Sequence, residues 1–118
     1  MQVVSSVEEL EQIYGTPGAA SLRKVADRIT PQYRKLIEAS PLCALATVGP
    51  EGVDASPRGD IKNVLYELDD KTVLMPDWRG NNRMDSLRNI VRDGRVAVML
   101  MTAGSNMVTR INGCAQVS

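Results

Sequence analysis

Histidine and phenylalanine are absent from this 118-residue chain, and its aromatic side chains are limited to one Trp and three Tyr. Without histidine, the chain cannot build His-based catalytic triads, His metal sites or His general bases. So few aromatic residues argue against platforms on which nucleic-acid bases stack. The 14 basic and 14 acidic residues balance, so no overall basic field attracts nucleic acid or an anionic membrane. We expect no nucleic-acid partner, and any anion site must be local.

Cysteine and long apolar runs are also scarce. The two cysteines, Cys43 and Cys114, are far apart in apolar surroundings and form no CxxC pair, which predicts buried free thiols in a reducing compartment. No apolar stretch approaches membrane-spanning length, and the start MQVVSSVEELEQ lacks a basic segment followed by an apolar run. We therefore expect a cytoplasmic protein with no membrane partner. The length suits one domain.

The first forty residues are expected to form short helices. In SVEELEQIYG, Ser6 is a suitable N-cap and Gly15 a suitable stop. AASLRKVADRIT, residues 19–30, has apolar residues at helical spacing, which predicts a second helix. Thr30-Pro31 then ends that helix and begins another in PQYRKLIEAS. We expect this helical segment, residues 1–40, to cover a sheet.

From Pro41 onward the pattern becomes that of strands. PLCALATVG and GVDASPRGD flank the turn signal GPEG, and IKNVLYELDDKTVLMP predicts a second hairpin with its turn at 69–71. RVAVMLMT and NMVTRINGCAQV predict two last strands around a Gly-Ser-Asn turn. Between these pairs, NNRMDSLRNIVRD predicts one amphipathic helix with a buried stripe of Met84, Leu87, Ile90 and Val91. About six antiparallel strands predict a mainly β (α+β) small barrel over residues 41–118.

The loop MPDWRGNNR lies between a predicted strand and the start of that helix. Free backbone N–H groups and the positive end of the helix dipole meet at such a place, which favours an anion. Asn82 and Arg83 can donate hydrogen bonds to phosphate oxygens, and Trp78 offers a flat wall for a ring system. In the alternative interpretation Asn82 only caps the helix, with Asp85 three residues on, and the arginines are solvated.

A second polar cluster is ASPRGDIKN, residues 55–63. Arg58, Asp60 and Lys62 alternate, so on a strand they would share one face, which is costly to bury unless it meets a polar ligand. The alternative is a solvated face of an edge strand. The tripeptide RGD alone is too weak a signal to indicate adhesion. Dinucleotide-binding, P-loop, nucleophile-elbow and zincin motifs are absent from the sequence.

The order of these motifs, SPRGD, LMPDWRGNNR, MDSLRNIVRD, RVAVML and RING, resembles the pyridoxamine 5'-phosphate oxidase-like FMN-binding family, in particular its uncharacterised bacterial branch. The resemblance runs from about Gly15 to Gly113. It implies an antiparallel split β-barrel with N-terminal helices and one inserted helix. It also implies a homodimer that holds FMN at its interface and acts on a small-molecule redox substrate.

Carried over position by position, the resemblance assigns no catalytic residue and no metal site, and it implies nine cofactor-binding positions. Residues from Arg58 to Lys62 would lie beside the flavin or its ribityl phosphate, Pro76 and Asp77 would present backbone to the ring edge, and Asn82 and Arg83 would hold the phosphate. The implied set is Arg58, Gly59, Asp60, Lys62, Pro76, Asp77, Trp78, Asn82 and Arg83. Asn82 departs from the family's basic pair.

The family continues beyond the RING position into further strands and helices, so we expect a C-terminally shortened member. The resemblance implies an FMN-dependent oxidoreductase in which the flavin supplies the redox chemistry. The alternative is a non-catalytic or degenerate cofactor-binding module. A deazaflavin could replace FMN, whereas the absence of histidine removes the usual haem ligand.

Overall fold

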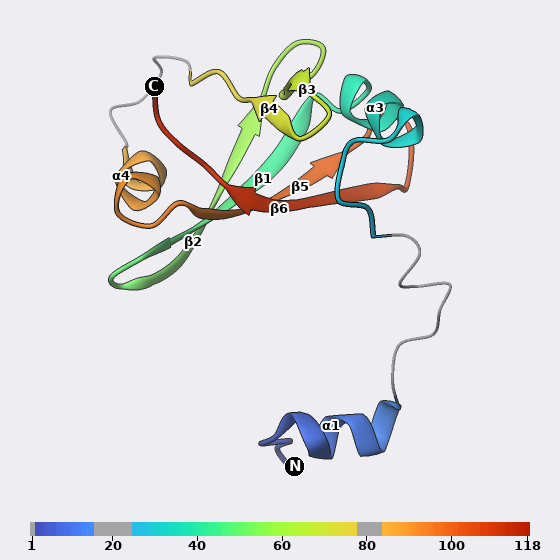
Figure 1. Cartoon of the computed structure of the whole chain (residues 1–118), viewed down its shortest axis with the longest axis vertical. Helices are drawn as coiled ribbons and strands as arrows, with labels where there is room; N and C mark the ends of the chain where they lie inside the picture. The colour runs from blue at the N-terminus through green and yellow to red at the C-terminus, as the bar shows by residue number, and fades with distance from the viewer. Residues whose placement is uncertain (1, 16–24, 78–83) are drawn as a thin grey trace.

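A four-stranded antiparallel sheet in the order β2-β1-β5-β6 forms the centre of the computed structural model, which describes residues 2–15, 25–77 and 84–118 (Figure 1). A smaller sheet pairs β3 with β4. The strands are β1 (Leu42–Gly49), β2 (Gly52–Gly59), β3 (Tyr66–Asp69), β4 (Thr72–Leu74), β5 (Arg95–Met101) and β6 (Val108–Cys114). The predicted fold class, mainly antiparallel β with added helices, is confirmed.

The turns of all three hairpins lie where the sequence predicted them. Gly52 and Gly104 adopt positive φ angles of 125° and 70° in the β1–β2 and β5–β6 turns, a conformation that glycine reaches without steric cost. In the β3–β4 turn the Asp69 carboxylate accepts a hydrogen bond from the backbone N–H of Lys71 at 2.9 Å. This bond is the main cause of the lowered pKa of Asp69, because it favours the charged form.

Of the three predicted N-terminal helices, two are confirmed. The third is wrong over the residues that the structure describes. Helix α1 (Val7–Tyr14) is capped by Ser6, and α3 (Pro31–Glu38) is capped by Thr30. Residues 25–30 are not helical; residues 19–24 of that prediction lie outside the described ranges. The backbone N–H of Ile29 bonds to the carbonyl of Asp70 at 2.6 Å, and Thr30 is extended because a residue before proline avoids the helical region.

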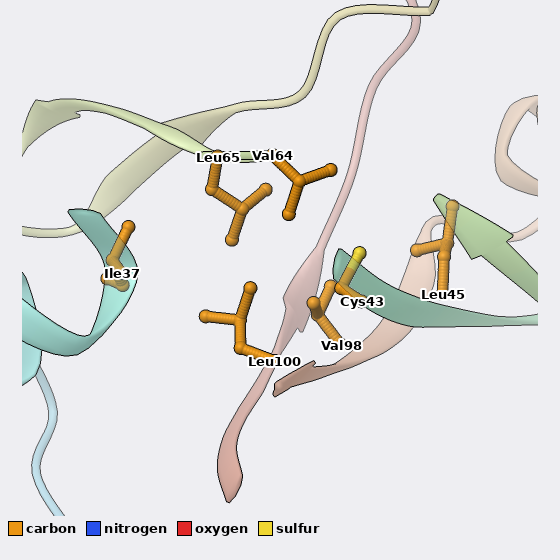
Figure 2. Close-up of a cluster of buried hydrophobic side chains, with 7 residues drawn as sticks. All are labelled: Ile37, Cys43, Leu45, Val64, Leu65, Val98 and Leu100. Atoms are coloured by element: carbon orange, nitrogen blue, oxygen red, sulfur yellow. The ribbon is translucent and has the colours of Figure 1, made fainter. Parts of the chain in front are cut away.

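The hydrophobic core lies between the main sheet, α3 and the segment before β3. Figure 2 shows the cluster, with Ile37 from α3 facing side chains of β1, β5 and the 64–65 segment: Cys43, Leu45, Val64, Leu65, Val98 and Leu100. Arg34 of α3 donates two hydrogen bonds to Glu67 of β3, at 2.6 and 2.9 Å. This fork fixes α3 against the small sheet.

Only one of the two cysteines is buried as predicted. Both thiols are free, but Cys114 is exposed because it lies near the end of the edge strand β6. Cys43 lies in the core, where burial raises the pKa of its thiol. A thiol held in its neutral form is a poor nucleophile, so Cys43 is a core residue.

Helix α4 (Asp85–Arg92) buries a face that matches the predicted stripe only in part, because Ile90 is buried and Leu87 is half-buried. Its buried residues are Ser86, Asn89 and Ile90, whereas Met84 and Val91 are exposed. Met84 is the N-cap and makes no side-chain capping bond. Asn82, the cap in the alternative interpretation, lies outside the described residues. None of the helices within the described ranges is long and apolar enough to cross a membrane.

The main sheet has two unlike faces. Cys43, Leu45 and Thr47 of β1 are buried and define the core face. Side chains alternate along a strand and directly paired residues share a face, so the residues of β2 and β5 that pair with these three lie on the core face as well. Helices α3 and α4 and the small sheet lie on this side (Figure 1). The opposite side, here called the outer face, carries Leu42, Ala44, Ala46, Val48, Val53, Ala55, Pro57, Gly59, Arg95, Ala97, Met99, Met101, Val108, Arg110, Asn112 and Cys114.

Candidate functional site

Arg58 is one of two charged side chains on the core face of β2; the other is Asp54, near the β1–β2 turn. Arg58 pairs with Cys43 of β1, and its side chain is 23% exposed. A guanidinium this close to an apolar core needs hydrogen-bonding partners to offset its lost hydration. Its Nε donates to Ser56 Oγ at 3.1 Å, and one terminal nitrogen forms an ion pair with the Asp77 carboxylate. Arg58 is therefore held in place where the core borders solvent, which we call the open end of the core.

The Arg58–Asp77 pair joins two predicted site segments that are 19 positions apart in the chain. Asp77 follows β4 and is about half exposed, so the pair lies at the border between core and solvent. Met75 packs against the core cluster, and Pro76 is half-buried. These contacts hold the segment after β4 beside β2. The structure thus brings Arg58, Pro76 and Asp77 to one place.

A row of polar contacts continues from Arg58 along the interface between the hairpin and α4. Ser86 Oγ donates to Ser56 Oγ at 3.4 Å, and Asn89 Nδ2 donates to Thr47 Oγ1 at 3.0 Å. We call Thr47, Ser56, Arg58, Ser86 and Asn89 the polar seam. Apart from Arg58, its members were missed in the sequence. The spacing of Ser86 and Asn89 by three puts them on one helical face, but polar residues on a helix ordinarily indicate the solvent side.

The remaining described site residues lie just beyond β2. The strand ends at Gly59, so the prediction that Arg58, Asp60 and Lys62 share one strand face is wrong. Instead, the N–H of Asp60 bonds to the Pro41 carbonyl at 2.9 Å, and the chain turns away. Lys62 is exposed. Trp78, Asn82 and Arg83 lie outside the described residues, as do Arg79, Gly80 and Asn81 of the same loop.

A separate hollow of about 490 Å³ lies between the β1–β2 turn and α4. Carboxylates and guanidiniums both line it, and its charged residues are Glu51, Asp54, Asp85, Arg88 and Arg92. None of the predicted site residues lines this hollow. An anion would meet three carboxylates there, and a flavin ring would find little apolar surface. The hollow therefore fits a flavin nucleotide less well than the surroundings of Arg58 do.

The chemistry available around Arg58 is hydrogen-bond donation. The guanidinium and the Ser56 and Ser86 hydroxyls can donate to anionic or carbonyl oxygens. Within the described ranges, no group of three or more residues is placed to hold a metal ion. The site can therefore bind and orient an oxygen-rich ligand, while any redox chemistry has to come from that ligand.

Comparisons with known proteins bear on the family and the fold. The family described as pyridoxamine 5'-phosphate oxidase matches residues 29–118. A search of curated protein sequences gave no match. Among solved structures, a tagged histidine-to-alanine variant of HupZ from Group A Streptococcus is similar, with a TM-score of 0.55 and 24% identity over 75% of this chain and 69% of that chain. At that identity the likeness concerns the fold.

Proposed function

Because the chain belongs to the pyridoxamine 5'-phosphate oxidase family, we propose that it is a flavoprotein that binds FMN, works as a homodimer and catalyses an oxidoreduction. One observation carries the proposal: Arg58 of β2 and Asp77 after β4 are paired at the open end of the core. That pairing joins the two segments to which the family resemblance assigns the cofactor. The loop with the remaining assigned residues directly follows Asp77.

The donor set around Arg58 fits a flavin nucleotide. FMN presents phosphate and carbonyl oxygens, which accept hydrogen bonds from a guanidinium and from hydroxyl groups. Arg58 and Ser86 would supply such donors, while Asn82 and Arg83 would hold the phosphate and Trp78 would stack on the ring. When bound, FMN would supply the hydride and electron transfer. The chain's own residues bind the cofactor, orient it and keep one side of it out of water.

The test of cofactor binding is titration with FMN, followed by absorbance after free FMN is removed. Arg58→Lys keeps the charge but loses the fork of donors, so we expect Kd to rise about 10-fold to 100-fold, because a charge-assisted hydrogen bond contributes about 1.5–3 kcal/mol. Arg28→Lys is the matched control and should leave Kd unchanged, because this exposed guanidinium pairs with Asp27 and Asp70 and with no residue of the proposed site. Equal affinities for Arg58→Lys and the wild type would overturn the Arg58 assignment.

The phosphate assignment has its own variant. Arg83→Ala removes a guanidinium from the loop, so FMN should bind more weakly while riboflavin, which lacks the phosphate, should be affected much less. Comparing the two ligands separates loss of a phosphate contact from general damage to the site. Equal weakening of both ligands would argue against Arg83 as a phosphate ligand.

A second candidate function is a cofactor-binding module without turnover. It is favoured by the surroundings of Arg58, whose described residues supply hydrogen-bond donors that can hold a ligand and no redox group. Anaerobic mixing of the FMN-loaded protein with NADH or NADPH distinguishes the two. Rapid bleaching of the flavin absorbance and its recovery in air support an oxidoreductase, and a flavin that stays oxidised supports the module.

A further inference from the structure

Helix α1 carries an apolar stripe that is not buried against any of the residues that the structure describes. Val7, Leu10, Ile13 and Tyr14 recur at spacings of three and four, which places them on one side of the helix. None of the helix's residues is buried, and the exposed fractions of these four range from 45% for Leu10 to 79% for Tyr14. An eight-residue helix is marginal in water by itself, because helices this short depend on tertiary packing. The stripe therefore indicates a contact that one copy of the chain does not make.

The outer face of the main sheet is the complementary feature. Most of its sixteen positions are Ala, Val, Leu, Met or Pro, although an antiparallel sheet with one solvated face usually alternates apolar and polar residues. Leu42, Val53, Met99 and Val108 are exposed there, while the described helices α3 and α4 and the small sheet lie on the core face (Figure 1). A broad apolar surface of this kind marks an interaction site.

The charges on the two surfaces are opposite. Helix α1 carries Glu8, Glu9 and Glu11 and no basic residue. The strand positions of the outer face include Arg95 and Arg110 and no carboxylate. Arg95 is paired with Asp93, whereas Arg110 forms no ion pair within the described ranges. An acidic amphipathic helix and an apolar face with only arginines as its charges are complementary in both apolar area and potential.

We propose that α1 of one copy docks its apolar stripe on the outer face of a second copy. Both surfaces include exposed apolar residues, and over residues 2–15, 25–77 and 84–118 of one copy they do not cover each other. A two-fold exchange would form it twice with the same residues. The proposal rests on the homodimer part of the proposed function and concerns surfaces other than the surroundings of Arg58, so it does not depend on flavin binding.

The first measurement is the dimer dissociation constant of the full chain by sedimentation equilibrium. Leu10→Asp puts a charge in the middle of the stripe and should raise this constant at least tenfold. Gln12→Asp adds the same charge to the opposite side of α1 and should not. Because Leu10 and Gln12 are both exposed, neither change should alter the thermal midpoint of the monomer.

Mixing two variants then shows whether the contact is made between copies. Leu10→Asp spoils the helix and Met99→Asp spoils the outer face, so each homodimer lacks an intact pair. A mixed dimer regains one: the unaltered helix of the Met99→Asp chain on the unaltered face of the Leu10→Asp chain. We expect equimolar mixtures to dimerise more tightly than either variant alone. Val108→Asp, on the edge strand β6, replaces Met99→Asp if that variant does not fold.

Three outcomes would overturn the proposal. A dimer unaffected by Leu10→Asp would leave the homodimer standing without α1 in its interface. No gain on mixing would show that the helix does not cross between copies. A wild-type chain that is monomeric at 100 µM would remove both the exchange and the proposed homodimer. FMN absorbance recorded on the same samples reports the flavin proposal separately, because a chain without flavin still gives a dissociation constant.

Discussion

At Gly49 the backbone of β1 passes so close to helix α4 that a side chain would not fit. A Cβ atom there would lie 2.3 Å from Asn89 Oδ1, well inside van der Waals contact. The Asn89 side chain also bonds to Thr47, so it cannot move away without losing that bond. Glycine is needed at this position for the close approach of strand and helix.

Gly49→Ala should therefore lower the free energy of unfolding by about 1–3 kcal/mol, measured by urea denaturation. Gly113→Ala is the matched control, because a Cβ at Gly113 in β6 would meet nothing within 4 Å. In the double variant Gly49→Ala/Asn89→Ala the two losses should not add, since they disturb one contact. A loss for Gly113→Ala as large as that for Gly49→Ala would contradict this account.

We expect the free energy of unfolding to depend on pH through Asp93, which follows the end of α4. Its carboxylate accepts hydrogen bonds from the Arg95 guanidinium and backbone N–H, and these lower its pKa from 3.8 to about 2. A depressed folded-state pKa contributes stability that is present above pH 3.8 and is lost as the pH falls toward 2. Asp93→Asn should flatten the dependence of urea-unfolding stability on pH in that window. An unchanged slope would show that the contact does not persist in solution.

Helix α4 shows most clearly that the buried side of a helix depends on what it packs against as well as on its apolar pattern. Its apolar residues predicted a stripe through Val91, yet Val91 is 75% exposed and Asn89 is 8% exposed. The helix lies over the end of β1, where the core face presents Thr47 and not an aliphatic residue. A buried amide facing a buried hydroxyl satisfies both groups, and this orientation turns Val91 outward.

The orientation of α4 is testable with two alanine variants. Asn89→Ala leaves the buried Thr47 hydroxyl without this partner and should lower stability by about 1–3 kcal/mol. Val91→Ala on the exposed side should change it by less than about 0.5 kcal/mol. Chemical denaturation of both variants gives the comparison. The reverse order of effects would mean that the stripe predicted from the sequence is the buried one.

At the scale of the whole molecule, the exchange of α1 predicts that the protection of this helix depends on protein concentration. In a monomer its backbone N–H groups should exchange with solvent almost as fast as in an unfolded peptide, because none of its residues is buried. Above the dimer dissociation constant they should become protected, while those of β1 and β5 change little. Hydrogen exchange followed by mass spectrometry at two concentrations measures this. Protection of α1 independent of concentration would argue against docking between copies.

The sequence indicated which segments contribute to the candidate site, but not which of their residues contact each other. The polar composition of SPRGD pointed to Arg58, and the family resemblance pointed to Asp77. Their ion pair, and the bonds from Ser86 and Asn89 to the hairpin, join residues 19 to 42 positions apart. Such contacts depend on how the elements pack. The strand alternation expected from Arg58 to Lys62 is not observed, because β2 ends at Gly59, directly before the hydrogen bond from the Asp60 N–H to the Pro41 carbonyl.

Local chemistry by itself determined which residues of this protein form helices and turns in most places. Ser6 and Thr30 cap α1 and α3, and Gly52 and Gly104 supply positive φ angles, because capping and turn formation act within a few residues. Alternation likewise determined the strands. Only the tertiary structure decided which side of α4 is buried, that Arg58 meets Asp77, and that the described helices and the small sheet lie on the core face and not on the outer face. Those outcomes depend on the partner surfaces that each element meets, which lie far away along the chain.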